Sequence, residues 1–107
     1  IALQFDGQDV RVVASWQDCY LALCEKLNDI DAEKFGALPD IAMFKRFFLR
    51  LIQRKKHADC YPAKFGANGD VKAKIIGSKS YFYMPNYVVY NLLKHYGIEP
   101  QKVTIRA

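Results

Sequence analysis

The sequence predicts a small α+β domain in which about three main helices pack on one face of a mixed or antiparallel sheet of about five strands. Short runs of alternating apolar and polar residues indicate strands, and runs with apolar residues three and four positions apart indicate helices. These runs follow one another in the order ββα-α-ββαβ. Hydrophobic residues make up 51% of the chain, which is enough apolar surface to offset the entropy lost on folding.

The chain has 107 residues, a length typical of one domain, so residues 1–107 are expected to form a single domain. Its first residue is Ile1 rather than Met, which favours a domain cut from a longer protein. No apolar run approaches the roughly 20 residues that span a bilayer, and the start lacks the pattern of a signal peptide. The odd number of cysteines favours free thiols. We therefore expect a cytoplasmic protein with no membrane partner.

The first strands are predicted as a hairpin over residues 2–14. Apolar and polar residues alternate on both sides of Asp6-Gly7, and Asp-Gly is a strong signal for a hairpin turn. The inward-facing residues of the whole predicted sheet are Phe5, Val10, Val12, Val71, Ala73, Ile75, Phe82, Val103 and Ile105, with Leu3 on the same face as Phe5.

The first helix is predicted to begin after Ser15. Serine is a favoured N-cap residue, and Asp18 stands where a capping box has its acidic partner. Apolar residues then recur at helical spacing as far as Leu27. We expect this helix to end within residues 28–31 and a short turn to occupy residues 32–38.

The second helix is predicted over residues 40–57, with Asp40 as its N-cap. Its apolar stripe consists of Ile41, Phe44, Phe47, Phe48, Leu51 and Ile52. Residues 58–70 hold one proline and two glycines, which is typical of a loop.

The last third of the chain is predicted to form a second hairpin, a helix and a final strand. The hairpin covers residues 71–84 and turns at Gly77-Ser78. The helix begins near Pro85 and ends at Gly97, a favoured residue just past a helix end. Residues 102–106 alternate as the last strand.

An internal repeat is indicated at an offset of 70 residues. Residues 3–26 and 73–96 both follow the order strand, glycine turn, strand and capped helix. We therefore predict that these segments form two similar hairpin–helix units.

Positive charge gathers in the middle of the chain. Residues 1–39 hold three basic and seven acidic residues, residues 40–57 hold six and one, and residues 58–107 hold seven and three. A basic segment of this kind favours acidic partners such as nucleic acid. The residues of the predicted helix that would contact phosphates are Arg46, Arg50, Arg54, Lys55 and Lys56. The alternative is a solvated face whose terminal cations complement the helix dipole.

The outer face of the predicted sheet is a second candidate surface for nucleic acid. Alternation places Lys72, Lys74, Tyr81 and Tyr83 on that face. A basic sheet face with tyrosines is similar to the platforms on which unpaired bases stack. The alternative is that the two tyrosines form a cross-strand pair or pack under a loop.

Motifs for catalysis or metal binding are weak in this sequence. His57 and Cys60 have a compact H-x-x-C spacing, but a zinc site needs about four ligands. The glycine-rich residues 66–70 precede a predicted strand, whereas a phosphate cradle leads into a helix. We therefore expect a protein that is not an enzyme and that uses neither a metal nor another cofactor.

Two segments of the chain, FDGQDVRVVASWQDCYLALCEKL and YFYMPNYVVYNLLKHYGI, carry a resemblance to a known class of domain. Their G-x-x-V-x-V strand, the helix start at Ser15-Trp16 and the helix end Leu-Leu-Lys-x-Tyr-Gly resemble an accessory α+β domain. That domain is appended at the C-terminus of bacterial restriction, defence or mobile-element proteins. The resemblance covers both ends of the chain and implies an accessory role beside nucleic-acid-processing modules. It implies no catalytic residues.

The sequence thus predicts a nucleic-acid-binding accessory domain, with DNA and RNA both open as ligands. The alternative is a protein-interaction or oligomerisation module of a larger bacterial protein. In that case, the acidic first third of one copy would meet the basic segment of another.

Overall fold

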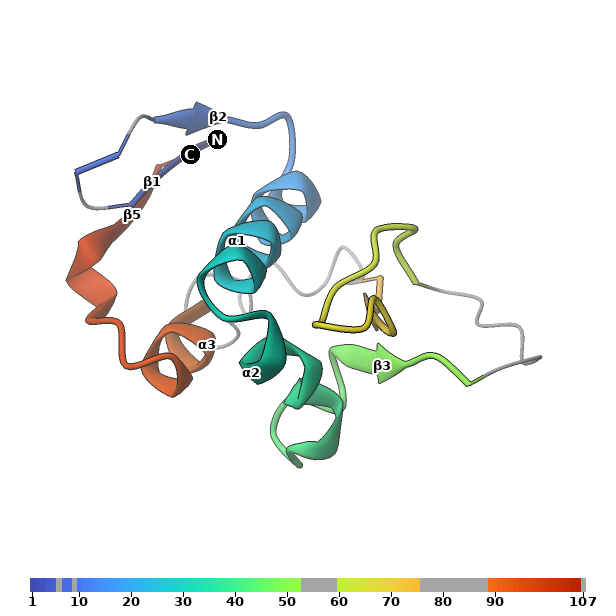
Figure 1. Ribbon diagram of the computed structural model, residues 1–107. Coiled ribbons are helices and arrows are strands. Elements are labelled where there is room, and N and C mark those ends of the chain that lie inside the picture. The colour runs from blue at the N-terminus through green and yellow to red at the C-terminus, as the bar shows by residue number, and fades with distance from the viewer. Residues whose placement is uncertain (6, 9, 53–59, 76–88, 107) are drawn as a thin grey trace. The chain divides into compact units, whose positions relative to one another are not determined.

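The structure is a computed structural model that describes residues 1–5, 7–8, 10–52, 60–75 and 89–106 (Figure 1). The chain divides into two units, one formed by residues 1–23 and 77–107 and the other by residues 24–76. Each unit is considered by itself below.

The sheet of the first unit has three strands within the described ranges, in the order β2-β1-β5. These are β1 (Ala2–Phe5), β2 (Arg11–Val12) and β5 (Val103–Arg106), and both pairings are antiparallel. The chain ends therefore lie side by side (Figure 1), with Ala2 opposite Arg106. The predicted first hairpin and last strand are confirmed.

The register of the first hairpin differs from the expected one. Leu3 lies opposite Arg11, so Ala2 and Val12 share the other face of the sheet. Leu3 is buried, whereas Val12 is 78% exposed and Val10 is 53% exposed. The prediction that both valines point inward is therefore wrong, because a shift of one residue moves a strand's side chains to the opposite face.

Helix α1 (Trp16–Ile30) begins as the sequence predicts. The Ser15 hydroxyl accepts a hydrogen bond from the Asp18 amide at 3.1 Å, which satisfies one of the free N–H groups at the helix start. The predicted apolar stripe is buried, and its fully buried members are Cys19, Tyr20, Leu23, Cys24 and Leu27.

Helix α3 (Val89–His95) ends in a motif that requires Gly97. The Gly97 amide donates to the Lys94 carbonyl and the Ile98 amide donates to the Leu93 carbonyl, which together form a Schellman motif. Gly97 has φ of +70°, a conformation that costs other residues free energy. The predicted end of this helix is confirmed. A short 3-10 turn (Pro100–Lys102) then leads into β5.

In the second unit, α1 is followed by a short helix that the sequence did not predict. Helix α2 (Ala32–Gly36) lies where a turn was expected, and Asp31 caps it by accepting a hydrogen bond from the Lys34 amide at 2.9 Å. Phe35 of this helix is buried. A 3-10 turn (Leu38–Asp40) follows, with Pro39 in its first turn.

Residues 42–50 contradict the predicted helix over residues 40–57. Residues 42–47 form hydrogen-bonded turns, and the chain then enters strand β3 (Phe48–Arg50). The last helix-like bond joins the Phe48 amide to the Phe44 carbonyl at 3.1 Å. After Phe48, the backbone groups of β3 form hydrogen bonds with β4 (Val71–Ala73). These bonds replace the ones that a longer helix would have formed within itself.

Strand β4 lies between β3 and the segment of residues 60–65. Phe48 is opposite Ala73 on one side, and on the other side Phe65 and Val71 exchange two backbone hydrogen bonds of 2.7 and 3.0 Å. Phe35 packs its ring against Phe48 and Phe65, with centroids 5.1 and 5.0 Å apart. These aromatic side chains form the core of the second unit.

The α+β class is confirmed, but the described strands form two antiparallel sheets where one was expected. Val71 and Ala73 point inward as predicted, whereas Ile75 is 49% exposed, contrary to the prediction. Residues 76–88 lie outside the described ranges, so the hairpin at Gly77-Ser78, Phe82 and the internal repeat of residues 3–26 and 73–96 stay predictions.

Candidate functional site

A basic surface in the described part of the second unit lies on the side of β3 and β4 away from the aromatic core. We call it the β3–β4 outer face and define it as Arg46, Phe47, Leu49, Lys72 and Lys74. Lys72 and Lys74 alternate with buried Val71 and Ala73, so their side chains project from the side opposite the core.

The backbone pairing places each lysine opposite an apolar residue in or just before β3. Leu49 lies opposite Lys72 in the strand register. The Lys74 amide donates to the Phe47 carbonyl at 2.7 Å, which puts Phe47 opposite Lys74. Both lysines are half-buried, as expected for stems that cover apolar surface while the ammonium groups reach water.

Arg46 extends this surface through an aromatic contact. Its guanidinium carbon lies 5.7 Å from the centroid of the Phe47 ring, within the range of a cation–π interaction. Arg46 is exposed. The structure therefore places Arg46 over the Phe47 ring, Lys74 opposite Phe47, and Lys72 two residues before Lys74 on the same face of β4.

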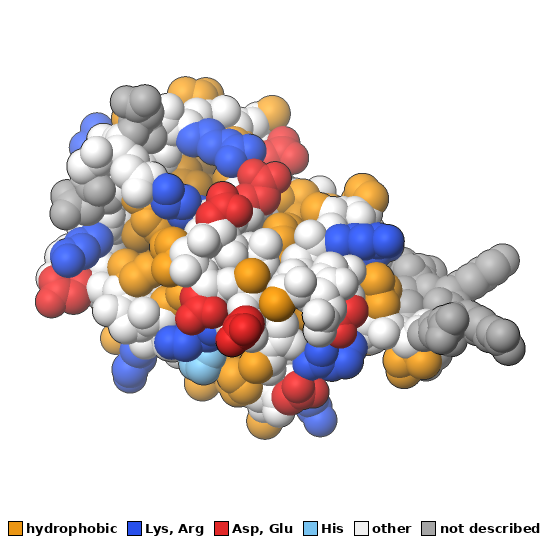
Figure 2. Space-filling model, in the orientation of Figure 1, with side chains coloured by type: hydrophobic (Ala, Val, Ile, Leu, Met, Phe, Trp, Pro, Cys, Tyr) orange, Lys and Arg blue, Asp and Glu red, His pale blue; other side chains and the backbone are white. Residues whose placement is uncertain are grey.

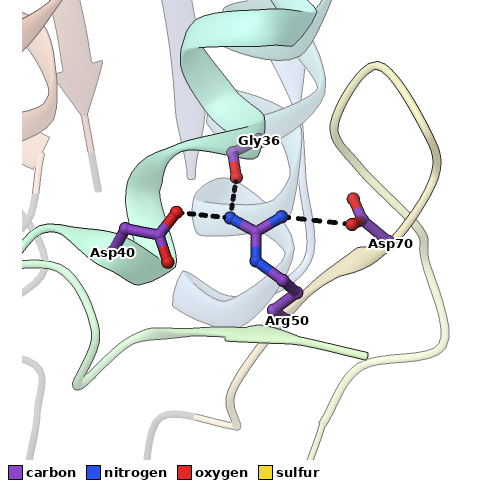
Figure 3. Close-up of polar contacts among 4 residues, drawn as sticks. All are labelled: Gly36, Asp40, Arg50 and Asp70. Atoms are coloured by element: carbon purple, nitrogen blue, oxygen red, sulfur yellow. Dashed lines mark hydrogen bonds and ion pairs between the residues drawn. The ribbon is translucent and has the colours of Figure 1, made fainter. Parts of the chain in front are cut away.

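Arg50 does not belong to the same surface, contrary to the prediction that it continues a helical row from Arg46. It shares a face of β3 with buried Phe48, because alternate residues of a strand point the same way. Its guanidinium donates to Asp40 Oδ2 at 2.7 Å, to Asp70 Oδ2 at 3.1 Å and to the Gly36 carbonyl at 2.7 Å (Figure 3). These acceptors take three of the five guanidinium N–H donors, and two of the acceptors are carboxylates whose negative charge disfavours a phosphate beside them.

Arg50 is permanently charged in this setting. Partial burial lowers the pKa of Arg50, but the hydrogen bonds and negative charges of Asp70 and Asp40 outweigh it and raise the pKa above its ordinary value. The cation therefore stays paired at any physiological pH, and it ties α2, β3 and the start of β4 together.

The depression around Arg50 is acidic rather than basic. It has a volume of about 410 Å³ and is lined in part by Glu33, Asp40, Asp70 and Asn68. Red and blue side chains lie next to one another near α2 and β3 (Figure 2). Because three carboxylates surround one guanidinium, the depression disfavours phosphate. Among the described residues, no group of His, Cys, Asp and Glu is arranged to hold a metal ion.

The remaining predicted contact residues cannot be placed on this surface. Arg54, Lys55, Lys56, Tyr81 and Tyr83 lie outside the described residues. Their participation in binding stays a prediction from the sequence.

Sequence reasoning missed Phe47 as the partner of Arg46 and missed both carboxylates that bind Arg50. The run Phe47-Phe48-Leu49 is one signal that was available, because consecutive bulky apolar residues fit a strand covered on both faces as well as a helix. The carboxylates had no such signal, since Asp70 is 20 residues away from Arg50.

Comparisons of this chain with models of protein families, with curated proteins and with solved structures found no match. The resemblance to a bacterial accessory domain therefore stays a prediction. In the part of the chain that the structure describes, no helix has the length and apolar character needed to cross a membrane.

Proposed function

We propose that this chain is a nucleic-acid-binding domain that acts through the β3–β4 outer face. The observation that carries the proposal is that Arg46, Lys72 and Lys74 lie on one face of β3 and β4, with Arg46 over the Phe47 ring and Lys74 opposite Phe47. Arg and Lys side chains bind mainly phosphate oxygens of nucleic acid. Such contacts position a protein on the backbone without reading the base sequence. We further propose that the domain has no catalytic activity and serves as an accessory to nucleic-acid-processing modules of a bacterial protein.

The charge of the chain supports this proposal. The net charge is +5. Lys45 and Arg46 come just before β3 in the sequence, and Arg54, Lys55 and Lys56 come shortly after it. Arg54, Lys55 and Lys56 are proposed to add phosphate contacts, and Tyr81 and Tyr83 to add stacking contacts. Arg50 is left out, because its charge is paired with Asp40 and Asp70 and it also donates to the Gly36 carbonyl.

The test is a double charge reversal, Lys72→Glu with Lys74→Glu. We expect affinity for a labelled oligonucleotide at about 50 mM salt to fall at least tenfold, because two phosphate contacts become repulsive. Fluorescence anisotropy measures this loss. The matched control is Lys94→Glu with Lys102→Glu, which makes the same change in net charge on exposed lysines of the first unit. Equal losses in both double variants, or no binding by the wild-type protein, would refute the proposal.

A second candidate function is a protein-interaction or oligomerisation module, and strand β2 favours it. Within the described residues β2 is an edge strand of its sheet, and Val12 is 78% exposed. An exposed apolar edge strand is a template for pairing with another chain.

Sedimentation at low and physiological salt tests this second candidate. An apolar contact through β2 should persist at both salt concentrations, whereas contact between the acidic first third and the basic segment should weaken as salt screens the charges. Val12→Lys should abolish the apolar contact and leave the charge-driven one. A monomer under both conditions would exclude self-association by either route.

A further inference from the structure

The β3–β4 outer face carries a planar guanidinium, that of Arg46, which can stack on a base, as well as the ammonium groups of Lys72 and Lys74, which can bind phosphates. The Arg46 guanidinium lies over the Phe47 ring, so the ring supports one side of the cation. A guanidinium is planar and stacks on flat π systems, which an ammonium group cannot do. Arg46 is exposed, and stacking on an arginine plane is one of the ways in which proteins hold an unpaired base.

The surrounding surface is more suitable for a single strand than for a duplex. Strands β3 and β4 are three residues long each, and their outer face presents side chains from a pleated surface rather than a helix that fills a groove. A duplex keeps its bases stacked inside and is read through its grooves. A single strand exposes base faces and backbone together, which is what a stacking group flanked by cations can bind.

From this arrangement we propose that the β3–β4 outer face binds single-stranded nucleic acid, with one base stacked on Arg46 and neighbouring phosphates bound by Lys72 and Lys74. This inference rests on the proposed function. Lys72 and Lys74 are two positions apart on one strand, which separates them by about 6.6 Å. Successive phosphates of an extended single strand are spaced similarly, so each lysine is able to bind one phosphate.

The first experiment compares strands without changing the protein. Anisotropy titrations use a labelled oligothymidine, an oligouridine of the same length and a mixed-sequence duplex at the same salt. We expect both single strands to bind at least tenfold more tightly than the duplex. Equal or tighter duplex binding would overturn this inference and leave the proposed function standing, whereas no binding to any of the three would overturn both.

The second experiment separates stacking from charge. Arg46→Lys keeps the positive charge and removes the planar group. We expect affinity for oligothymidine to fall by about tenfold, since the base loses the planar group on which it stacks. Phe47→Leu, which removes the ring beneath the guanidinium, should change affinity in the same direction by a smaller factor. Circular dichroism of each variant checks that the fold is retained.

An oligonucleotide with abasic sites provides the matched control, because it keeps the phosphates and removes the bases. The wild-type protein should bind this strand more weakly than oligothymidine, and Arg46→Lys should then have little further effect. If the abasic strand binds as tightly as oligothymidine, or if Arg46→Lys weakens both strands equally, the base is not stacked on Arg46 and the inference is overturned.

Discussion

At the scale of single residues, Arg50 shows how a basic side chain is withdrawn from ligand binding. Its guanidinium binds two carboxylates and one backbone carbonyl from segments before and after β3 (Figure 3). The side chains of Arg50 and Asp40 are 38% and 70% exposed. Solvent therefore screens this pairing, and its contribution to stability is moderate.

We predict that Arg50→Met lowers the free energy of unfolding by about 1 kcal/mol, because three acceptors lose their donor in a partly exposed site. Urea denaturation measures the change. Arg46→Met is the matched control and should change stability by no more than about 0.5 kcal/mol, as expected for an exposed side chain. If the two variants are equally stable, the cluster around Arg50 has no role in holding the second unit together.

The pH dependence of this contribution follows from the sign of the shift. The pKa of Arg50 is raised above its ordinary value, so the stabilisation from its charge is complete below that ordinary value and is lost only as pH rises through the raised pKa. The stability difference between wild type and Arg50→Met should therefore be the same at pH 7 and pH 9. A difference that shrinks over this range would contradict the assigned pairing.

The cysteines give a second prediction at the residue scale. Cys19 and Cys24 are buried and Cys60 is half-buried. Burial raises the pKa of the Cys19 thiol, and the nearby N-terminal ammonium offsets only part of this effect. Because the thiolate is the reactive form, Cys60 should react with an aromatic disulfide reagent in the native protein, and Cys19 and Cys24 only after unfolding. Rapid native reaction of more than one thiol would show that the buried face of α1 is open.

At the scale of elements, a close approach between α2 and the turn before β4 is possible because two glycines meet there. Gly66 has φ of +89°, and a Cβ at Gly66 would lie 3.3 Å from the Gly36 Cα. The Gly66 amide also donates to Asn28 Oδ1 of α1 at 2.8 Å. One residue thus fixes the turn against two helices.

We predict that Gly66→Ala destabilises the protein more than Gly69→Ala does. Both glycines have positive φ, at +89° and +64°, but nothing lies within 4 Å of a Cβ at Gly69. The Gly69 variant should lose about 1 kcal/mol from backbone conformation alone, and the Gly66 variant should lose about 2 kcal/mol or more because backbone atoms must also move. Thermal and urea unfolding measure both. If both variants lose the same free energy of unfolding, the close approach of Gly66 to Gly36 does not contribute to stability.

At the scale of the whole molecule, charge is the property most directly linked to the proposed function. The net charge of +5 is made up of an acidic first third and basic later segments. Within the described residues, part of the positive charge is paired internally, as at Arg50, and part is presented on the β3–β4 outer face. Net charge alone therefore overstates the number of cations available to a ligand.

The salt dependence of binding counts those available cations. If Arg46, Lys72 and Lys74 each neutralise one phosphate, the log of affinity for a single strand should fall with the log of salt with a slope of about −2. A steeper slope in wild type would indicate that Arg54, Lys55 or Lys56 contribute. A slope near zero would contradict electrostatic binding altogether.

The sequence by itself determined the elements whose signals are local. The hairpin turn at Gly7, the Ser15 cap of α1 and the Gly97 end of α3 depend on contacts within a few residues, and each prediction is confirmed. These hydrogen bonds and backbone preferences join residues that are close in sequence, so their signals can be recognised without knowledge of the fold.

The tertiary structure alone decided which face Val12 occupies, where residues 41–50 change from turns to strand, and which partners Arg50 has. Val12 is exposed because of its pairing with Ala2, and β3 exists because β4 supplies its backbone partners from more than 20 residues away. Phe44 and Phe48 are both buried in the structure, and their spacing of four residues also fits the apolar stripe of a helix. Their apolar spacing therefore left the choice to long-range hydrogen bonds, which a local pattern does not contain.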